Sequence, residues 1–470
     1  MTNLVRLDEI EHSESYNFSK LYLQRNCEYE YEGIPFPMAN YANNCKYVSQ
    51  ESFTDLYITK KTCKHLLSAF SLNCRSLSAN WDSYNELLAN INSSKFAFDL
   101  LGISELFNLP PDLSFELEGY HDIICKNRDP NDSVRGGVGL YIKKDIIYKD
   151  RPDLTLFIPH VIETIFVEIK VNNCKNIIVG NIYRPNTYPR ADMDIFMSNM
   201  INILETVNKE NKKVLLMGDF NIDLLKFESD ARINTFIDNM ISLGMLPIIT
   251  KPTRVTKDTA TLIDHIYLNT SNSSVTSGII ITDVADHFGV FTMIEDIAVK
   301  KISSLKQYRP FTDNNLTYFK QLLTENDYSS VLNNNDVDEA YNKFLNIYHK
   351  SYEQAFPLKT IKQKSKYTKQ QPWMTEGLLA SSIKKNKLFK LKLKTPTDAN
   401  ISKYKDYCTI YNKLRRQAKR NHYISIFNKY KHDTKNSWSA IKKSLVKLVT
   451  KTICLPLLLC MVNRYLMGHK

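Results

Sequence analysis

A short apolar run that ends in a glycine and two polar groups places the strongest constraint on the fold of this 470-residue chain. Residues 214–216, Val-Leu-Leu, continue into 217–221, Met-Gly-Asp-Phe-Asn. A buried strand of about 4–8 apolar residues has this pattern, and a glycine often marks its end. Side chains at i and i+2 of an extended chain share a face, so we expect Asp219 and Asn221 to lie together. Such a pair suits hard metal ions and phosphate oxygens, although the motif alone is equally compatible with a surface turn.

The segment around this motif alternates between strand-like and helix-like patterns. Apolar runs typical of strands lie at 69–72, 98–103, 138–142, 164–169, 177–183, 214–217, 262–268 and 289–293. Apolar residues at helical spacing occur at 81–91, 192–207 and 231–243. Many strands with few helices predict an α/β sandwich, with sheets inside and helices outside. We place this domain at residues 68–296.

The flanking segments differ from this domain in pattern. Residues 1–67 are polar with little periodicity and are predicted to be mostly disordered. Residues 297–358 are predicted to be a linker with short helices, and 359–448 to be a basic helical region. Residues 449–470 are predicted to be an irregular tail. Their apolar run contains Pro456 and is shorter than the roughly 20 residues that a membrane span needs.

The charge is divided unevenly along the chain. Residues 359–447 contain 24 Lys/Arg and 4 Asp/Glu, a net charge of +20, whereas the first 358 residues carry −11. The acidic part suits carboxylate-rich metal chemistry, and the basic part suits a polyanion such as nucleic acid. A solvated lysine-rich helical face would give the same composition. The nucleic-acid interpretation points to the cations of the second basic helix, at 403–431: Lys413, Arg415, Arg416, Lys419 and Arg420.

Aromatic residues interleave with these basic groups, and cysteines are scattered through the chain. The aromatic side chains could stack on bases, but their helical spacing favours packing. The nine cysteines form no CxxC pair, which disfavours zinc and favours reduced intracellular thiols. The N-terminus has no uninterrupted apolar segment typical of a signal peptide. We therefore do not expect secretion. We also expect a monomer without stable membrane association, in the nucleus, which the Lys/Arg clusters permit, or otherwise in the cytoplasm.

Polar groups follow several of the predicted strands. Asn73 ends the first, Glu105 follows the second, and 182–186 is Ile-Tyr-Arg-Pro-Asn. Asp-His at 264–265 lies inside a strand, and Ala-Asp-His at 285–287 precedes the last one. Each has an ordinary structural explanation, and His265 is most simply a core histidine. Five such strand ends in one domain are far less expected from structure alone.

As a set, these motifs resemble the endonuclease/exonuclease/phosphatase superfamily, which includes abasic-site DNA endonucleases and deoxyribonuclease I-like enzymes. Residues 218–221 resemble its central motif, and 285–287 resemble its terminal Ser-Asp-His with Ala285 in place of serine. The first two motifs match at Asn73 and Glu105, and the Tyr-x-x-Asn segment matches at Tyr183 and Asn186. The resemblance covers about residues 68–296. It implies a four-layer α/β/β/α sandwich, deoxyribonuclease I-like, followed here by a basic helical extension.

Four further segments resemble the endonuclease domain of LINE-type (non-LTR) retrotransposon polyproteins. They are Asn-Cys-Arg-Ser-Leu at 73–77, Arg-Gly-Gly-Val-Gly at 135–139, Lys-Pro-Thr-Arg at 251–254 and Ala-Thr-Leu-Ile-Asp-His-Ile at 260–266. The Pro-Trp pair at 372–373 and the basic helices resemble the spacer before the reverse transcriptase. No Tyr/Phe-x-Asp-Asp motif is present. The resemblance therefore implies a polyprotein truncated before its polymerase, with DNA strand nicking for target-primed retrotransposition as its activity.

In that family the site hydrolyses a phosphodiester with Mg²⁺ (or Mn²⁺). The resemblance implies that Glu105 holds the metal with Asn73 nearby, and that Asp286 supports the metal or the neighbouring histidine. A divalent cation reverses the local sign of charge, polarises the phosphoryl oxygen and lowers the pKa of bound water. The loss of a serine hydroxyl at Ala285 would cost about 1 kcal/mol of hydrogen bonding and weaken the geometry around Asp286.

The resemblance also assigns the catalytic groups. Asp219 positions or deprotonates the attacking water with help from Asn221. His287 contacts the scissile phosphate or transfers a proton, and Asp264 orients it. Donors of this kind stabilise charge at a pentacoordinate phosphorus. Tyr183 steadies the phosphate or the leaving oxygen, and Asn186 is a further catalytic position. Arg184 and Arg254 are assigned to nucleic-acid contact.

The expected partner is therefore DNA, with RNA as a further partner of the basic helical region. Two other functions stay open. One is a phosphoinositide or sphingolipid phosphoesterase of the same superfamily, because anionic lipid attracts the same positive charge. The other is an inactive nucleic-acid-binding remnant, which the truncation and Ala285 would explain.

Overall fold

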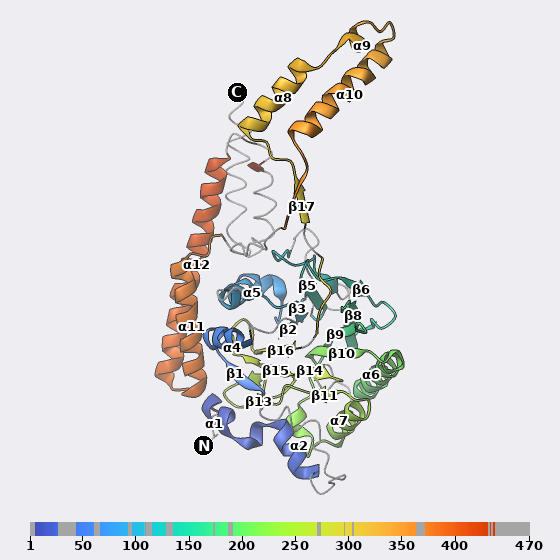
Figure 1. Ribbon diagram of the computed structural model, residues 1–470. Coiled ribbons are helices and arrows are strands. Elements are labelled where there is room, and N and C mark those ends of the chain that lie inside the picture. Colours follow the sequence, from blue (N-terminus) through green and yellow to red (C-terminus); the bar gives the residue numbers. More distant parts are fainter. Residues whose placement is uncertain are drawn as a thin grey trace. The chain divides into compact units, whose positions relative to one another are not determined.

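The computed structural model of the chain describes residues 5–26, 44–60, 66–92, 96–107, 109, 115–127, 135–172, 174–186, 191–269, 274–295, 297–302, 305–362, 372–430, 433 and 436–437. The chain divides into two compact units, of which Lys301–Lys366 is one and the rest of the chain is the other. Figure 1 shows the two seven-stranded sheets of the larger unit, with helices on either side. This is the mixed α/β fold that the strand and helix patterns predict.

Two parallel neighbours lie in the middle of the first sheet. Its strands follow the order β1 (Lys46–Val48), β15 (Val275–Ile280), β16 (Gly289–Glu295), β2 (Leu66–Asn73), β3 (Leu100–Ser104), β5 (Val138–Ile142) and β4 (Ile124–Lys126). Strands β2 and β3 run parallel, and Asn73 is the register partner of Ser104. The carboxyl ends of these two strands therefore deliver Asn73 and Glu105 to one edge of the sheet.

The second sheet brings another set of strand ends together. Its order is β11 (Leu246–Pro247), β14 (Asp264–Leu268), β10 (Lys213–Asp219), β9 (Ile177–Tyr183), β8 (Ile162–Ile169) and β6 (Tyr148–Asp150), with β7 (Phe157–Ile158) paired to β8. Asp219 is the register partner of Tyr183 on the parallel strand β9 and of Asp264 on the antiparallel strand β14. Tyr183, Asp219 and Asp264 therefore lie at the same level on three neighbouring strands of this sheet.

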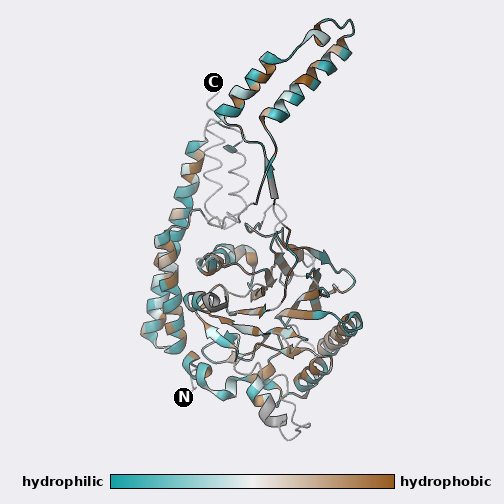
Figure 2. Cartoon of the chain, in the orientation of Figure 1, coloured by the Kyte–Doolittle hydropathy of each residue, from teal (hydrophilic) through white to brown (hydrophobic). Residues whose placement is uncertain are grey.

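Successive side chains of a strand point to opposite faces of its sheet, so the buried residues form more than one cluster. Leu67 and Ala69 of β2 belong to the same buried cluster as Leu215 and Met217 of β10, so the two sheets share this cluster. The buried amide of Asn181 also joins them, because it donates to the carbonyl oxygens of two first-sheet residues, Ile103 (3.0 Å) and Gly139 (2.9 Å). Figure 2 shows apolar residues concentrated in these strands.

Helices cover the outer faces of the sheets. Phe70 and Leu72 of β2 pack in a second cluster with Trp81 and Tyr84 of α5 (Leu77–Asn92) and with Phe53 of α4 (Gln50–Lys60). The second sheet packs with α6 (Ala191–Glu210) and α7 (Ala231–Ser242), which contribute buried residues to the shared cluster. The short elements η2 (Leu224–Lys226), β12 (Arg254–Val255) and β13 (Ala260–Thr261) lie in the connections.

The prediction that residues 1–67 are mostly disordered is wrong for the described part. This part forms α1 (Leu7–His12), η1 (Glu14–Tyr16), α2 (Phe18–Asn26), β1 and α4. Leu7, Ile10 and Phe18 are fully buried, and β1 pairs with β15. A few apolar side chains order this segment by packing against the domain, and such sparse contacts leave little periodicity in the sequence. Residues 1–4, 27–43 and 61–65 lie outside the described part.

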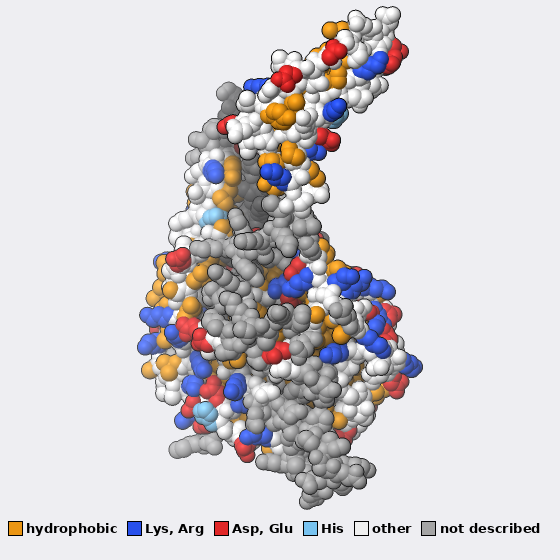
Figure 3. Space-filling view, viewed as in Figure 1, with side chains coloured by type: hydrophobic (Ala, Val, Ile, Leu, Met, Phe, Trp, Pro, Cys, Tyr) orange, Lys and Arg blue, Asp and Glu red, His pale blue; other side chains and the backbone are white. Residues whose placement is uncertain are grey.

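The predicted linker at 297–358 instead contains most of the smaller unit. Its elements are β17 (Leu305–Tyr308), α8 (Asp313–Glu325), α9 (Ser329–Leu332), α10 (Val337–Ala355) and β18 (Lys359–Lys362), with β17 paired to β18. Aromatic contacts join Phe319 of α8 to Tyr348 and Tyr352 of α10. Few residues here are buried, and Figure 3 shows apolar side chains at its surface. This weak core explains why the sequence pattern resembles a linker.

The basic region folds as two helices, α11 (Glu376–Lys394) and α12 (Asp398–Lys429), with the break at the expected Thr395-Pro396. The second helix starts before the predicted residue 403, because the side chain of Thr397 caps it by accepting from the Asn400 amide. None of the helices in the described part of the chain has the length and apolar character of a membrane span. The predicted tail at 449–470 lies outside the described residues.

Candidate active site

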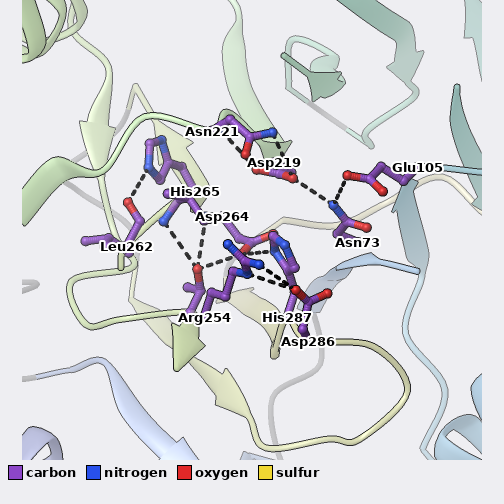
Figure 4. Close-up of polar contacts among 12 residues, drawn as sticks. Asn73, Glu105, Asp219, Asn221, Arg254, Leu262, Asp264, His265, Asp286 and His287 are labelled. Atoms are coloured by element: carbon purple, nitrogen blue, oxygen red, sulfur yellow. Dashed lines mark hydrogen bonds and ion pairs between the residues drawn. The ribbon is translucent and has the colours of Figure 1, made fainter. Parts of the chain in front are cut away.

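The polar strand ends of both sheets converge on one site, drawn in Figure 4. The first sheet supplies Asn73 as the last residue of β2 and Glu105 just beyond β3. The second sheet supplies Tyr183, Asp219 and Asp264 from the ends of β9, β10 and β14. Each side chain is therefore fixed by a strand within a hydrogen-bonded sheet, which gives the site a rigid base.

The amide of Asn73 bridges the two halves of the site. Asn73 Nδ2 donates to Asp219 Oδ2 (2.8 Å) and to Glu105 Oε1 (3.1 Å). The hydroxyl of Tyr183 donates to the same Glu105 oxygen (3.3 Å). Glu105 adopts a positive φ of 52°, which is strained for a residue of this type. The carboxylates of Glu105 and Asp219 are thus brought close and separated by a neutral donor.

The central motif reaches its geometry through a turn. Asn221 has a φ of 48°, so it is not extended as the same-face argument assumed. Its backbone N–H donates to Asp219 Oδ1 (2.9 Å), and its side-chain amide donates to Asp219 Oδ2 (3.2 Å) and to the Arg184 carbonyl (2.8 Å). The two side chains do lie together, as expected. The reason is the left-handed turn at Asn221, which asparagine tolerates well.

A second hydrogen-bonded group lies beside the first. His287 Nδ1 is 2.9 Å from Asp264 Oδ2, and the Thr253 hydroxyl donates to that oxygen at 2.6 Å. Asp264 is 2% exposed and His287 6%, so this pair is screened from water. With Nδ1 committed to Asp264, Nε2 is the ring nitrogen left for a substrate. Thr253 lies in the Lys-Pro-Thr-Arg segment, where sequence reasoning noted a family likeness but assigned it no role.

The electrostatic environment prepares these groups for proton transfer. Burial, and then the neighbouring Asp264 carboxylate, raise the pKa of Asp219 to about 7. Burial opposes charge on His287, but the Asp264, Asp219 and Asp286 carboxylates together outweigh it and raise the pKa of His287 to about 9. Near neutral pH the metal-free protein therefore has a protonated histidine beside a carboxyl group that is close to its midpoint.

Asp286 is committed to two arginines. Arg254 donates to Asp286 Oδ2 from Nη2 (2.7 Å) and Nε (3.0 Å), and Arg75 Nη1 lies 3.4 Å from the other oxygen. Burial raises the pKa of Asp286, but bonding to Arg254 and the charges of His287 and Arg75 hold it below its usual value. None of the described contacts joins Asp286 to Glu105. Sequence reasoning missed Arg75, although it follows Asn73 within a quoted motif.

Other predicted residues lie at the margin of this group. Arg184 donates from Nη1 to the Asn221 carbonyl (3.2 Å), and its guanidinium lies over the ring of Phe196. Asn186 is exposed beyond the end of β9, and none of the described contacts joins it to the others. His265 is a core histidine, as expected, because burial lowers its pKa to about 4 and its Nε2 contacts the Leu262 carbonyl (3.1 Å).

The predicted nucleic-acid-binding residues of α12 fall into two groups. Lys413, Arg416 and Arg420 are exposed. Arg415 instead pairs with Glu86 on α5 (3.2 Å), and Lys419 pairs with Asp82 on the same helix (2.9 Å). These contacts do not support the assignment of Arg415 and Lys419 to nucleic-acid binding. Both face the protein's own carboxylates.

The donor set suits a hard divalent cation. Ligand atoms of Asp219, Asp264 and His287 lie within 4.8 Å of one another. Asp264 and His287 are already hydrogen-bonded to each other. Because Mg²⁺ also prefers oxygen ligands, we assign this pair to proton transfer rather than to metal binding. Glu105 supplies carboxylate oxygens that fit such an ion, with Asp219 adjacent, whereas the amide oxygen of Asn73 accepts from the Arg75 backbone N–H (3.0 Å).

Residues 70–287 match the model of the Endonuclease/Exonuclease/phosphatase family. Its members are nucleases or phosphatases and generally depend on divalent metals. The family match therefore supports a hydrolytic enzyme of the phosphodiesterase type.

Several solved structures match about half of the chain. They include humanized D. rerio TDP2 carrying 14 mutations (14% identity; 49% of this chain and 99% of that chain; TM-score 0.37). The catalytic domain of Xenopus laevis APE2 is 14% identical (51% and 94%; TM-score 0.37). The 3'-5' exonuclease NExo from Neisseria meningitidis is 16% identical (49% and 100%; TM-score 0.38). A sequence comparison with curated proteins found no match.

Proposed function

We propose that this chain is a Mg²⁺- or Mn²⁺-dependent endonuclease that nicks DNA, derived from a LINE-type retrotransposon. One observation carries the proposal: the hydrogen-bonded set of Glu105, Asn73 and Asp219 lies beside the Asp264–His287 pair. The set combines a metal-binding carboxylate, a base near its midpoint and a protonated donor, which are the groups that phosphodiester hydrolysis needs. The proposal includes the four-layer α/β/β/α arrangement of deoxyribonuclease I-like enzymes.

The metal would be held by Glu105, with Asn73 nearby. When bound, the cation polarises the phosphoryl oxygen and neutralises charge that would otherwise repel the substrate. Asp219 accepts the proton of the attacking water, and the amides of Asn73 and Asn221 fix the direction of its oxygens. His287 donates to a phosphate oxygen from Nε2 while Asp264 holds its ring, and Thr253 in turn holds Asp264. Tyr183 and Asn186 steady the phosphate or the leaving oxygen.

Exposed cations support a nucleic-acid substrate. Arg75 and Arg254 have side chains 64% and 40% exposed, and Asp286 holds both next to His287. The exposed Lys413, Arg416 and Arg420 of α12 would add contacts to a longer polyanion, DNA or the RNA of the element. The LINE-type motifs at 135–139 and 251–254 favour DNA nicking over lipid-headgroup hydrolysis. We propose that the protein acts as a monomer in the nucleus.

Conversion of supercoiled plasmid to nicked circles tests this function. We expect the full chain to nick DNA with Mg²⁺ or Mn²⁺, and chelation to stop it. Asp219→Ala and His287→Ala should each lower the rate by at least about 100-fold, since each removes a group used in proton transfer. Glu228→Ala, an exposed carboxylate outside the site, is the control and should cut normally.

Two outcomes would overturn the proposal. Hydrolysis of inositol phosphates with DNA left intact would assign the site to a phosphoinositide phosphoesterase. Absence of metal-dependent cleavage by a folded chain that still binds DNA would identify an inactive nucleic-acid-binding remnant.

A further inference from the structure

The loop that carries Asp286 and His287 is held partly by the basic helices. At its ends, the Ile281 amide donates to the Val48 carbonyl (3.0 Å), and the Phe288 amide donates to the Thr253 carbonyl (2.8 Å). Between them, Asp283 turns toward α11 and α12. Its carboxylate lies 3.2 Å from Lys385 Nζ and accepts a hydrogen bond from the hydroxyl of Tyr404 (2.8 Å).

Lys385 is a buried cation shared by two carboxylates. Its side chain is only 6% exposed, and its Nζ also lies 3.1 Å from Glu86 Oε1. Burial opposes its charge, but the Asp283 and Glu86 carboxylates raise the pKa of Lys385 above its usual value. The ammonium group therefore stays charged and cannot reach an external polyanion. A buried charge of this kind is stable only while its partners stay in place.

The second carboxylate belongs to the helix that follows the metal-binding end of the site. Glu86 lies on α5, which begins four residues after Asn73, at Leu77. Glu86 also accepts hydrogen bonds from Tyr411 (2.7 Å) and Arg415 (3.2 Å) of α12. The helix that follows Asn73 and the loop that precedes His287 thus meet at one ammonium group.

We propose that Lys385 is a positioning residue for the nuclease site, and that α11 and α12 form an integral part of the catalytic unit. By holding Asp283 against Glu86, Lys385 fixes the loop at 281–288 relative to α5, and so fixes His287 relative to Asn73. The proposal rests on the proposed nuclease activity. It also states that the family segment at 70–287 does not by itself contain every group that orders its site.

Variants of the full chain test this role. Lys385→Met removes the ammonium group, so Asp283 and Glu86 both lose their ion pair with it. We expect kcat for plasmid nicking to fall by roughly 10- to 100-fold, because small misplacements of catalytic groups have effects of this size. KM should stay within about twofold, because the buried Lys385 cannot contact DNA, and Lys385→Arg should restore most of kcat.

A matched control lies on the same helix. Lys394 pairs with Asp8 (2.7 Å) and Glu11 (3.0 Å) of α1, and none of the described contacts joins it to residues 281–288. Lys394→Met removes an ion pair that also docks α11, and we expect it to leave kcat unchanged. An equal loss in both variants would show that Lys385 only docks the helix and would overturn the proposal.

Hydrogen exchange provides a readout that does not need activity. In Lys385→Met the backbone amides of residues 281–288 should exchange faster than in the parent chain, whereas in Lys394→Met they should not. Unchanged exchange in Lys385→Met would overturn the positioning role. If the parent chain cuts no substrate, the proposed function fails, and this comparison still decides whether Lys385 orders the loop.

A gentler pair of variants applies if Lys385→Met does not fold. Tyr404→Phe removes the hydroxyl that bonds Asp283, and Tyr411→Phe removes the equivalent hydroxyl that bonds Glu86. Both changes delete one hydroxyl from α12, in the first case from a half-buried side chain and in the second from a buried one. We expect faster exchange at 281–288 in Tyr404→Phe alone. The same exchange in both variants would contradict the proposal.

Discussion

At the scale of single residues, a neutral amide holds the site together. Asn73 uses its two N–H groups on Asp219 and Glu105, one from each sheet. A third carboxylate in its place would add repulsion, and a cation would neutralise the charge that a metal needs. Asp264 plays the corresponding part for His287 by keeping the imidazole protonated and oriented. The acid and base of the site thus owe their properties to uncharged donors, to neighbouring carboxylates and to burial.

The pH dependence of cleavage follows from these two groups. Asp219 must be ionised to accept a proton, so the rate should rise with pH through about 7, the pKa that burial and Asp264 give it. His287 must stay protonated to donate, so the rate should fall as pH passes about 9. A pH–rate profile of plasmid nicking should therefore be bell-shaped.

The acidic limb should respond to the metal. A bound cation favours the ionised carboxylate of Asp219. Higher Mg²⁺ should therefore shift the rise of the rate to lower pH and leave its fall near pH 9 in place. At low Mg²⁺, a rate that stays constant as the pH passes the Asp219 pKa of about 7 would contradict the role given to Asp219.

At the scale of elements, the strand–turn junction at the end of β10 decides where Asp219 points. Gly218 has a φ of 138°, and a Cβ there would lie 1.9 Å from the Ile182 carbonyl oxygen on β9. Only glycine allows β10 to stay paired with β9 up to Asp219. The apolar runs at 138–142 and 177–183 match β5 and β9 residue for residue.

Strand β15 escaped prediction for a physical reason. Its sequence Val-Thr-Ser-Gly-Ile-Ile holds a polar Ser277 that is buried because it donates to the Ile248 carbonyl (2.8 Å), and Gly278 packs close to Phe291. Neighbouring elements supply both interactions. The local sequence pattern therefore does not indicate a strand at residues 275–280.

Gly218→Ala tests the junction. We expect it to lower the free energy of unfolding by about 3 kcal/mol or more, since it combines backbone strain with a clash. Gly244→Ala is the matched control, because Gly244 also has a positive φ (79°) but a Cβ there meets nothing within 4 Å. That variant should lose only about 1 kcal/mol from strain. Urea unfolding measures both, and equal losses would show that the close approach to Ile182 is unimportant.

At the scale of the larger unit, the positive charge of the C-terminal helices is divided between two uses. Lys385, Arg415 and Lys419 face acidic groups of the family domain, whereas Lys413, Arg416 and Arg420 face solvent. The sequence places all of these cations in one basic region. Only the exposed set is available to DNA.

The salt dependence of DNA binding should report the exposed set. Replacing Lys413, Arg416 and Arg420 by glutamine should reduce the slope of log Kobs against log salt by about 0.9 for each phosphate that is no longer neutralised, up to about 3 in total. Filter binding or anisotropy over a salt series measures this. Glutamine at the exposed Lys149, Lys170 and Lys175 makes the same change in net charge and is the control. Equal slopes in the two triple variants would contradict a specific role for α12.

The sequence by itself determined the central strands and the polar residues at their ends, including Asn73, Glu105, Asp219 and His287. It could do so because alternation, glycine and strand-end polarity are local properties of the chain. Only the tertiary structure decided that Asn73 joins both sheets and that Arg75 and Arg254 hold Asp286. It also decided that Lys385 is buried between Glu86 and Asp283. The partner of a side chain depends on which elements pack against it, and no local pattern records that choice.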